Sequence, residues 1–217
     1  MKTLSRAGAC AALTQAFCYL FGFALLVTVM DSGNVEGWSA LQKLEYLLER
    51  EALFQLWNLV IYVVFGVALV ILTAALHHRL APTDPPLMSV ATPFGYIWSG
   101  LVIASGMVAS VGLSAVSEMQ ATDPDGAAQL WSTLGVIQSG LGGGVEIVGG
   151  LWVLLLSVSS LRRGQGFPVM LTWLGVLVGL AGLATIVPAW SALGAVFGMT
   201  QIVWFIWVGI TLFRAPS

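Results

Sequence analysis

Six apolar runs, each long enough to cross a lipid bilayer as a helix, constrain this chain more than any other feature of its sequence. A transmembrane helix needs about 20 mostly apolar residues. The runs cover residues 7–30, 54–76, 93–116, 130–161, 168–188 and 192–213. Charged residues make up only 8% of the 217 residues, whereas a soluble domain has about 25%. The sequence therefore predicts an all-α fold, a single membrane domain of six transmembrane helices surrounded by the lipid bilayer, and it excludes a soluble globular enzyme.

The limits of these runs agree with local signals. A signal-peptide core has only about 7–15 apolar residues, so the longer first run predicts a retained helix. Thr92-Pro93 and Pro168 place a proline where the third and fifth helices are expected to begin, and proline is favoured in the first turn of a helix.

The basic residues predict how the chain is threaded. Cytoplasmic loops carry an excess of lysine and arginine. In a six-helix threading one side carries Lys2, Arg6, Arg79, Arg162, Arg163 and Arg214, and the other side carries only Lys43 and Arg50. Both termini are therefore expected in the cytoplasm.

The connection after the first run contains a second kind of helix signal. Ser39-Ala40-Leu41-Gln42 has the form of a capping box. Apolar residues recur after it at helical spacing, at Trp38, Leu41, Leu44 and Leu48. This pattern predicts a short amphipathic helix on the outer surface, and the alternative is a solvated extension of the second transmembrane helix.

Glu146 is the only acidic residue within a predicted transmembrane helix. A carboxylate at the centre of such a helix costs at least about 2.5–3.5 kcal/mol, so an intramembrane acid is a functional-site hypothesis by default. The glycines that flank it, Gly142, Gly143 and Gly144 on one side, let a ligand or another backbone approach closely and weaken the helix. We expect a kink or a local opening at these glycines.

Several polar side chains in other predicted helices are candidates to face Glu146. Gln55, Asn58 and Tyr62 lie three and four residues apart and form one stripe. Gln15 and Gln201 lie at comparable depth in the first and sixth helices. Together they predict a polar centre that binds a ligand, a proton or a cation. The alternative is a purely structural hydrogen bond from a protonated Glu146.

Small residues and tryptophans add packing signals. Gly-x-x-x-Gly pairs, which allow membrane helices to approach closely, occur at Gly140/Gly144, Gly175/Gly179 and Gly194/Gly198. We expect these pairs to pack helices inside the bundle, with a dimer interface as the alternative.

Trp98, Trp152, Trp204 and Trp207 fall deep in the predicted helices. We expect them to be lipid-facing bulk, with an aromatic-lined pocket as the alternative.

Other kinds of chemistry find no support. His77 and His78 are the only histidines, which leaves too few imidazoles for a metal site, and no cofactor is expected. A lone carboxylate without a second acid or base is a poor catalytic set, so we expect no enzyme. The net charge of −2 provides no basic surface for nucleic acid.

Three segments together resemble a known family. They are Gly144–Trp152, then Arg162-Arg163-Gly164 followed by Phe167-Pro168, then Leu174–Gly182. With Glu51–Phe54 ahead of the second helix, they are similar to a family of uncharacterised bacterial six-helix integral membrane proteins. The resemblance covers most of the chain. It implies a bacterial inner-membrane protein of no established activity, and it assigns a role to no residue.

Two functions remain open on the sequence alone. In the first, the protein is an accessory, scaffolding or assembly subunit that packs against a larger membrane complex, as its small loops and small-residue faces suggest. In the second, it is a proton- or cation-linked small-molecule transporter or a ligand-binding membrane protein centred on Glu146. Six helices are few for a secondary transporter, so the second function implies a homodimer.

Overall fold

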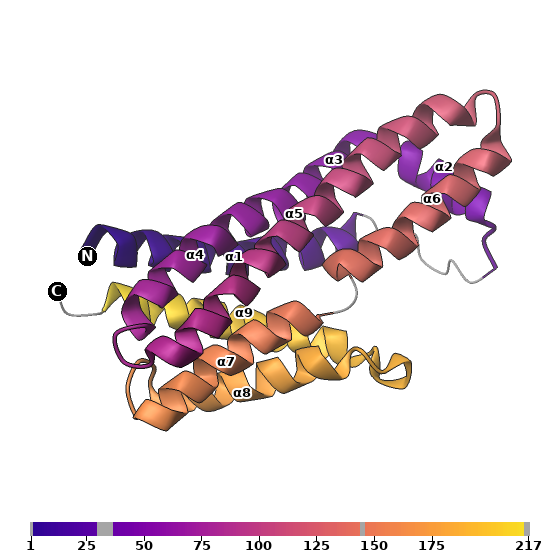
Figure 1. The fold of residues 1–217 in the computed structure, drawn as a ribbon. Helices are drawn as coiled ribbons and strands as arrows, with labels where there is room; N and C mark the ends of the chain where they lie inside the picture. The colour runs from indigo at the N-terminus through magenta and orange to yellow at the C-terminus, as the bar shows by residue number, and fades with distance from the viewer. Residues whose placement is uncertain (1, 30–36, 144–145, 215–217) are drawn as a thin grey trace.

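The computed structural model describes residues 2–29, 37–143 and 146–214, and over these residues the chain is helical and has no strand. The elements are α1 (Lys2–Thr28), α2 (Ala40–Leu48), α3 (Glu51–Asn58), the π-helical η1 (Leu59–Val64), α4 (Phe65–Leu80), α5 (Pro85–Gln120), α6 (Pro124–Gln138), η2 (Ser139–Gly143), α7 (Ile147–Arg163), α8 (Val169–Ala184), the 3₁₀ turn η3 (Pro188–Trp190) and α9 (Leu193–Phe213). Figure 1 shows an elongated bundle in which α1 begins and α9 ends at the same end. We call this the proximal end and the opposite one the distal end.

Five helical stretches in the described part of the chain are long and apolar enough to cross a membrane. They cover residues 2–28, 51–80, 85–120, 124–163 and 193–213. The sixth apolar helix, α8, has 16 residues and is therefore about 24 Å long. Large apolar side chains are exposed along the bundle, for example Phe17, Val111 and Met170. Soluble monomers rarely expose apolar surface on this scale, so the fold is that of a membrane protein.

The predicted start of the third transmembrane helix is wrong. α5 begins eight residues earlier, at Pro85, and Pro93 lies inside it. Pro85 and Pro86 occupy the first turn, where a missing N–H removes no helical hydrogen bond. An internal proline is tolerated in membrane helices because neighbouring groups satisfy the freed carbonyl. The Thr92-Pro93 signal therefore did not mark a helix start.

The predicted fourth transmembrane helix is not continuous. α6 ends at Gln138, η2 follows, and α7 begins only after Glu146. Gly142 has a φ of 117°, a backbone conformation that glycine adopts without steric cost. The expected break is thus confirmed at Gly142, whereas Gly144 lies outside the described residues.

A distal lobe extends the bundle. α5 has 36 residues and is about 54 Å long, far longer than the about 30 Å hydrocarbon core of a bilayer. Its distal end packs with α2, α3 and α6 around a separate cluster of buried side chains: Leu44, Phe54, Leu113, Val116, Ala127 and Ala128. α2 is the helix predicted after Ser39, and Ser39 and Gln42 make both hydrogen bonds of the capping box. Its apolar face, with Leu44 fully buried, lies against the protein.

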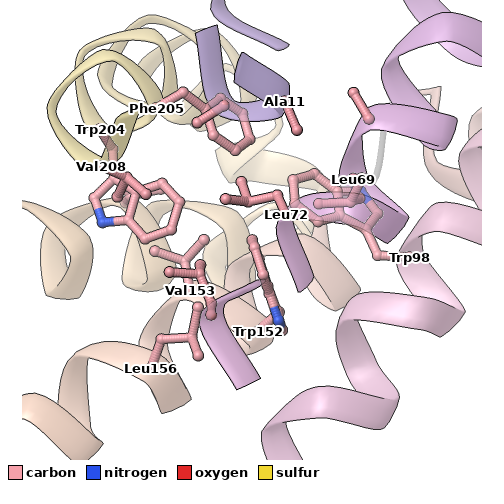
Figure 2. Close-up of a cluster of buried hydrophobic side chains, with 14 of the residues drawn as sticks. Ala11, Leu69, Leu72, Trp98, Trp152, Val153, Leu156, Trp204, Phe205 and Val208 are labelled. Atoms are coloured by element: carbon pink, nitrogen blue, oxygen red, sulfur yellow. The ribbon is translucent and has the colours of Figure 1, made fainter. Parts of the chain in front are cut away.

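The main core joins α1, α4, α5, α7, α8 and α9 (Figure 2). Trp98 of α5, Trp152 of α7 and Trp204 of α9 form a row in this core. The ring centroids of Trp98 and Trp152 are 5.8 Å apart, and those of Trp152 and Trp204 are 5.9 Å apart. All three are at most 2% exposed. The interpretation of these tryptophans as lipid-facing bulk is therefore wrong, because they form the centre of the helix packing.

Two polar contacts join the turns at the proximal end. The Arg79 guanidinium donates to the Gly166 carbonyl oxygen at 3.0 Å. Arg163 forms an ion pair with the buried Asp84 at 3.2 Å. The α4–α5 turn is thereby held against the α7–α8 turn, which fixes the position of α7 relative to α5.

Candidate functional site

A cavity of about 220 Å³ lies between α1, α3 with η1, the start of α4, α5 and the break before α7. Its lining residues are Cys18, Tyr19, Gly22, Phe23, Leu26, Trp57, Ile61, Tyr62, Phe65, Trp98, Val102, Gly142 and Glu146. The lining is almost entirely apolar or aromatic. Within the described part of the chain, Glu146 is its only aspartate, glutamate, lysine, arginine or histidine.

Two irregular helical segments flank the cavity. Ile61 and Tyr62 belong to η1, and Gly142 belongs to η2. Gly106 of α5 lets the Tyr62 side chain lie against the α5 backbone, because a Cβ at Gly106 would lie only 2.5 Å from the Tyr62 Cβ. π-helical segments are rare and occur frequently at functional sites. Here both such segments contribute residues to the wall of the cavity that Glu146 also lines.

Glu146 is placed by its backbone. It is the N-cap residue of α7, its N–H donates to the Thr185 hydroxyl at 2.9 Å, and its carbonyl oxygen accepts the N–H of Gly150 at 2.8 Å. Among the described residues its carboxyl group has no hydrogen-bond donor and no ion-pair partner. Tyr19 and Tyr62 line the same cavity. The backbone of Glu146 is therefore fixed at the cavity wall, and within the described part of the chain its carboxyl group is unpaired.

Aromatic rings form most of the remaining wall. Tyr19 packs edge-on against Phe65 with centroids 5.4 Å apart, and Phe65 packs in the same way against Trp98 at 5.7 Å. Trp57 lies edge-on to Tyr62 at 6.2 Å, and its ring N–H donates to the Gly22 carbonyl oxygen at 3.2 Å. These contacts hold the rings in fixed orientations around the cavity.

The structure brings together only two of the predicted polar residues, because only Tyr62 and Glu146 line the cavity. Gln55 instead donates to the Ser110 carbonyl oxygen at 3.2 Å. Gln15, Asn58 and Gln201 are fully buried, and their side-chain amides have no hydrogen-bond partner among the described residues. Those three amides lie in the helix packing and outside the cavity.

Five aromatic lining residues were not predicted as site residues: Tyr19, Phe23, Trp57, Phe65 and Trp98. A signal for some of them does exist. Tyr19, Gly22 and Phe23 are three and four residues apart, as are Trp57 and Ile61, so each set shares one helix face. Such stripes occur on every apolar helix, so the sequence alone could not identify these aromatic residues as site residues.

The glycine pairs have different surroundings. A Cβ at Gly175 or Gly179 would meet α7, and one at Gly198 would lie 3.3 Å from Phe23 of α1. Gly194 has only Thr185 nearby, at 3.9 Å, and Gly140 has open space. Gly144 lies outside the described residues. The close approach of α7 and α8 is clearest at Gly150, where a Cβ would meet only backbone atoms of α8.

Nothing in the described part of the chain groups three or more His, Cys, Asp or Glu side chains into a metal site. Comparison of the chain with protein-family models, with curated proteins and with solved structures gives no match. The cavity must therefore be interpreted from its own chemistry.

Proposed function

We propose that this protein is a bacterial inner-membrane protein of six transmembrane helices that binds a small ligand in the cavity beside Glu146 and exchanges that ligand against a proton. The observation that carries the proposal is the unpaired Glu146 carboxyl group at the wall of an otherwise apolar and aromatic cavity. Ligand sites typically combine apolar and aromatic walls with a few fixed polar groups. The Glu146 cavity has this composition.

The cost of the carboxyl group supports a functional role. Helix cohesion in a membrane can be supplied by a neutral amide, and a carboxyl group is expensive there. A structural carboxyl group would donate or accept a hydrogen bond, since buried polar groups are nearly always paired. Glu146 has no such partner among the described residues, and neither have the amides of Gln15, Asn58 and Gln201. Unlike those amides, Glu146 lines the cavity, which favours a group kept free for a ligand or a proton.

The threading follows from the distribution of charge. The start of α1 and the end of α9 lie at the proximal end, together with the basic residues of the α4–α5 and α7–α8 turns. This distribution of charge favours a cytoplasmic position for the proximal end. α8 completes the sixth crossing together with the turns after it, and a short helix is accommodated by local thinning at modest cost. Glu146 lies 17 residues from Arg163, about 25 Å along α7, and so falls in the outer part of the bilayer.

The exposed part of the lining suggests where a ligand enters. Phe23 and Leu26 are the most exposed lining residues, at 39% and 48%, and both are apolar. Exposed apolar lining of this kind suits a molecule that reaches the site from the lipid phase.

Modification by dicyclohexylcarbodiimide tests the proposal without knowledge of the ligand. This small apolar reagent reacts with protonated carboxyl groups that it can reach within a membrane. We expect it to modify Glu146 in the purified protein in mild detergent, to a lesser extent as the pH rises, with the site identified by mass spectrometry of peptides. Glu146→Gln should remain unmodified at that peptide.

Glu118 provides the control, because it is an exposed carboxylate at the distal end of α5. The Glu118→Gln variant should be modified as the unaltered protein is. An unaltered protein that takes up no reagent at Glu146 would contradict a proton-exchanging carboxyl group that small molecules can reach.

The accessory-subunit hypothesis makes a different prediction. A stoichiometric larger complex should then copurify when the protein is extracted in mild detergent from cells that express it at its natural level. A bare monomer or homodimer in that experiment would favour the ligand-binding function.

A further inference from the structure

The chemistry of the cavity wall narrows the class of ligand. Resting on the proposed function, we propose that the ligand is a small organic ammonium ion, bound with its charged head between the Glu146 carboxylate and the faces of the surrounding aromatic rings. Three properties of the wall carry this inference: its rings, its charge and its size.

The rings come first. Six of the 13 lining residues are aromatic: Tyr19, Phe23, Trp57, Tyr62, Phe65 and Trp98. The face of an aromatic ring carries partial negative charge and attracts a cation within about 6 Å, and cages of such rings recognise quaternary ammonium groups. The rings come from α1, α3, η1, α4 and α5, so they surround the space from several sides.

The charge of the wall has one sign. Among the described residues, Glu146 is the only carboxylic acid of the lining, and no lysine, arginine or histidine lines the cavity. An anionic ligand would face the carboxylate with no compensating cation. A neutral ligand would leave a desolvated carboxylate unpaired, which is costly. A cation removes that cost, and its alkyl substituents suit the apolar remainder of the wall.

The size limits the ligand further. Pockets for drug-sized ligands have volumes of about 300–1,000 Å³, so a cavity of about 220 Å³ takes a smaller molecule. A trimethylammonium head with one ring or one short alkyl chain is of the right order. Large polycyclic cations would not fit.

A proton and the ammonium ion would compete for the same carboxyl group. The other titratable groups in the lining, among the described residues, are Tyr19 and Cys18 on α1 and Tyr62 on η1. No basic side chain lines the cavity within the part of the chain that the structure describes. A quaternary ammonium ion does not titrate. The affinity for such an ion should therefore rise with pH as Glu146 loses its proton.

A matched pair of probes tests the inference on the unaltered protein. Benzyltrimethylammonium carries a fixed positive charge, and neopentylbenzene has the same shape with a carbon atom in place of the nitrogen. Binding of each probe is measured by titration calorimetry in mild detergent near pH 8. We expect the cation to bind at least about tenfold more tightly than the neutral probe, the scale of a desolvated cation–π interaction plus an opposite charge.

Variants then test whether residues of the cavity wall cause the preference for the cationic probe over the neutral one. Glu146→Gln should lose most of the preference for the cation and its dependence on pH. Tyr62→Phe keeps the ring and should keep most of the affinity, whereas Tyr62→Leu should lose several-fold. Trp173→Leu is the matched control, because Trp173 is an exposed ring on α8 outside the cavity and its removal should change nothing.

The outcomes separate this inference from the proposed function. Equal binding of the two probes would overturn the ammonium class and leave a ligand site in place. Failure of the unaltered protein to bind the cation would also overturn the class. In both cases the carbodiimide experiment still decides the proposed function, because modification of Glu146 depends on neither probe.

Discussion

The Thr185 hydroxyl joins Glu146 to the end of α8. It lies 2.9 Å from the Glu146 amide nitrogen, from which it accepts a hydrogen bond, and it donates to the Gly182 carbonyl oxygen at 2.7 Å. Thr185 is 4% exposed, so water does not replace either contact. One buried hydroxyl thus fixes the N-cap residue of α7 against the last turn of α8, and it holds the Glu146 backbone beside the cavity.

Replacement of Thr185 by valine should destabilise the protein. Valine keeps the shape of the side chain but leaves the Glu146 N–H without its acceptor. An unpaired buried donor costs about 1–3 kcal/mol, so the free energy of unfolding should fall by about that amount. Thermal unfolding in mild detergent measures the loss. Thr185→Ser keeps the hydroxyl and should lose less, and equal losses in the two variants would show that the hydroxyl is not what matters.

The contact between α7 and α8 gives a second prediction. A Cβ at Gly150 would lie 2.8 Å from the Gly179 carbonyl oxygen and 2.9 Å from the Leu183 amide nitrogen. Backbone atoms cannot move aside as side chains can, so Gly150→Ala must push the two helices apart. Overpacking of this kind costs about 1–3 kcal/mol, and the midpoint of thermal unfolding should fall.

Gly135→Ala is the control for that substitution. Gly135 lies in α6, and a Cβ there would meet nothing within 4 Å. Alanine is a better helix former than glycine by about 0.5–1 kcal/mol, so this variant should be as stable as the unaltered protein or more so. A Gly150→Ala variant that behaves like Gly135→Ala would mean that α7 and α8 are not in close contact.

The sequence located the chemistry of the site better than its geometry. The cost of a carboxylate in lipid drew attention to Glu146, and the glycines before it predicted the break that Gly142 makes. The aromatic wall was hidden because apolar helices carry rings on every face, and only tertiary packing decides which of them surround a cavity. The π-helical segment Leu59–Val64 is also invisible in an apolar run, since its one-residue offset leaves no mark on composition.

The same reasoning explains the errors at the helix ends. Thr92-Pro93 and Pro85-Pro86 carry similar start signals, and the structure uses the earlier pair. Length alone could not choose between them, because α5 has 36 residues and is longer than one membrane crossing requires from either start. The buried amides of Gln15 and Gln201 were expected beside Glu146 from their depth, but depth along a helix does not specify the direction in which a side chain points.

The orientation of the bundle leads to the last prediction. Two exposed turns serve as reporters: the α5–α6 turn at Thr122 and the α7–α8 turn at Gln165. In a background with Cys10→Ala and Cys18→Ala, a membrane-impermeant maleimide should label Thr122→Cys on intact cells. It should label Gln165→Cys only after the membrane is opened. The reason is that the basic residues next to Gln165 favour a cytoplasmic position for its turn, whereas the turn at Thr122 has acidic neighbours. Labelling of both variants on intact cells, or the reverse pattern, would overturn the threading and with it the placement of Glu146 in the outer part of the bilayer.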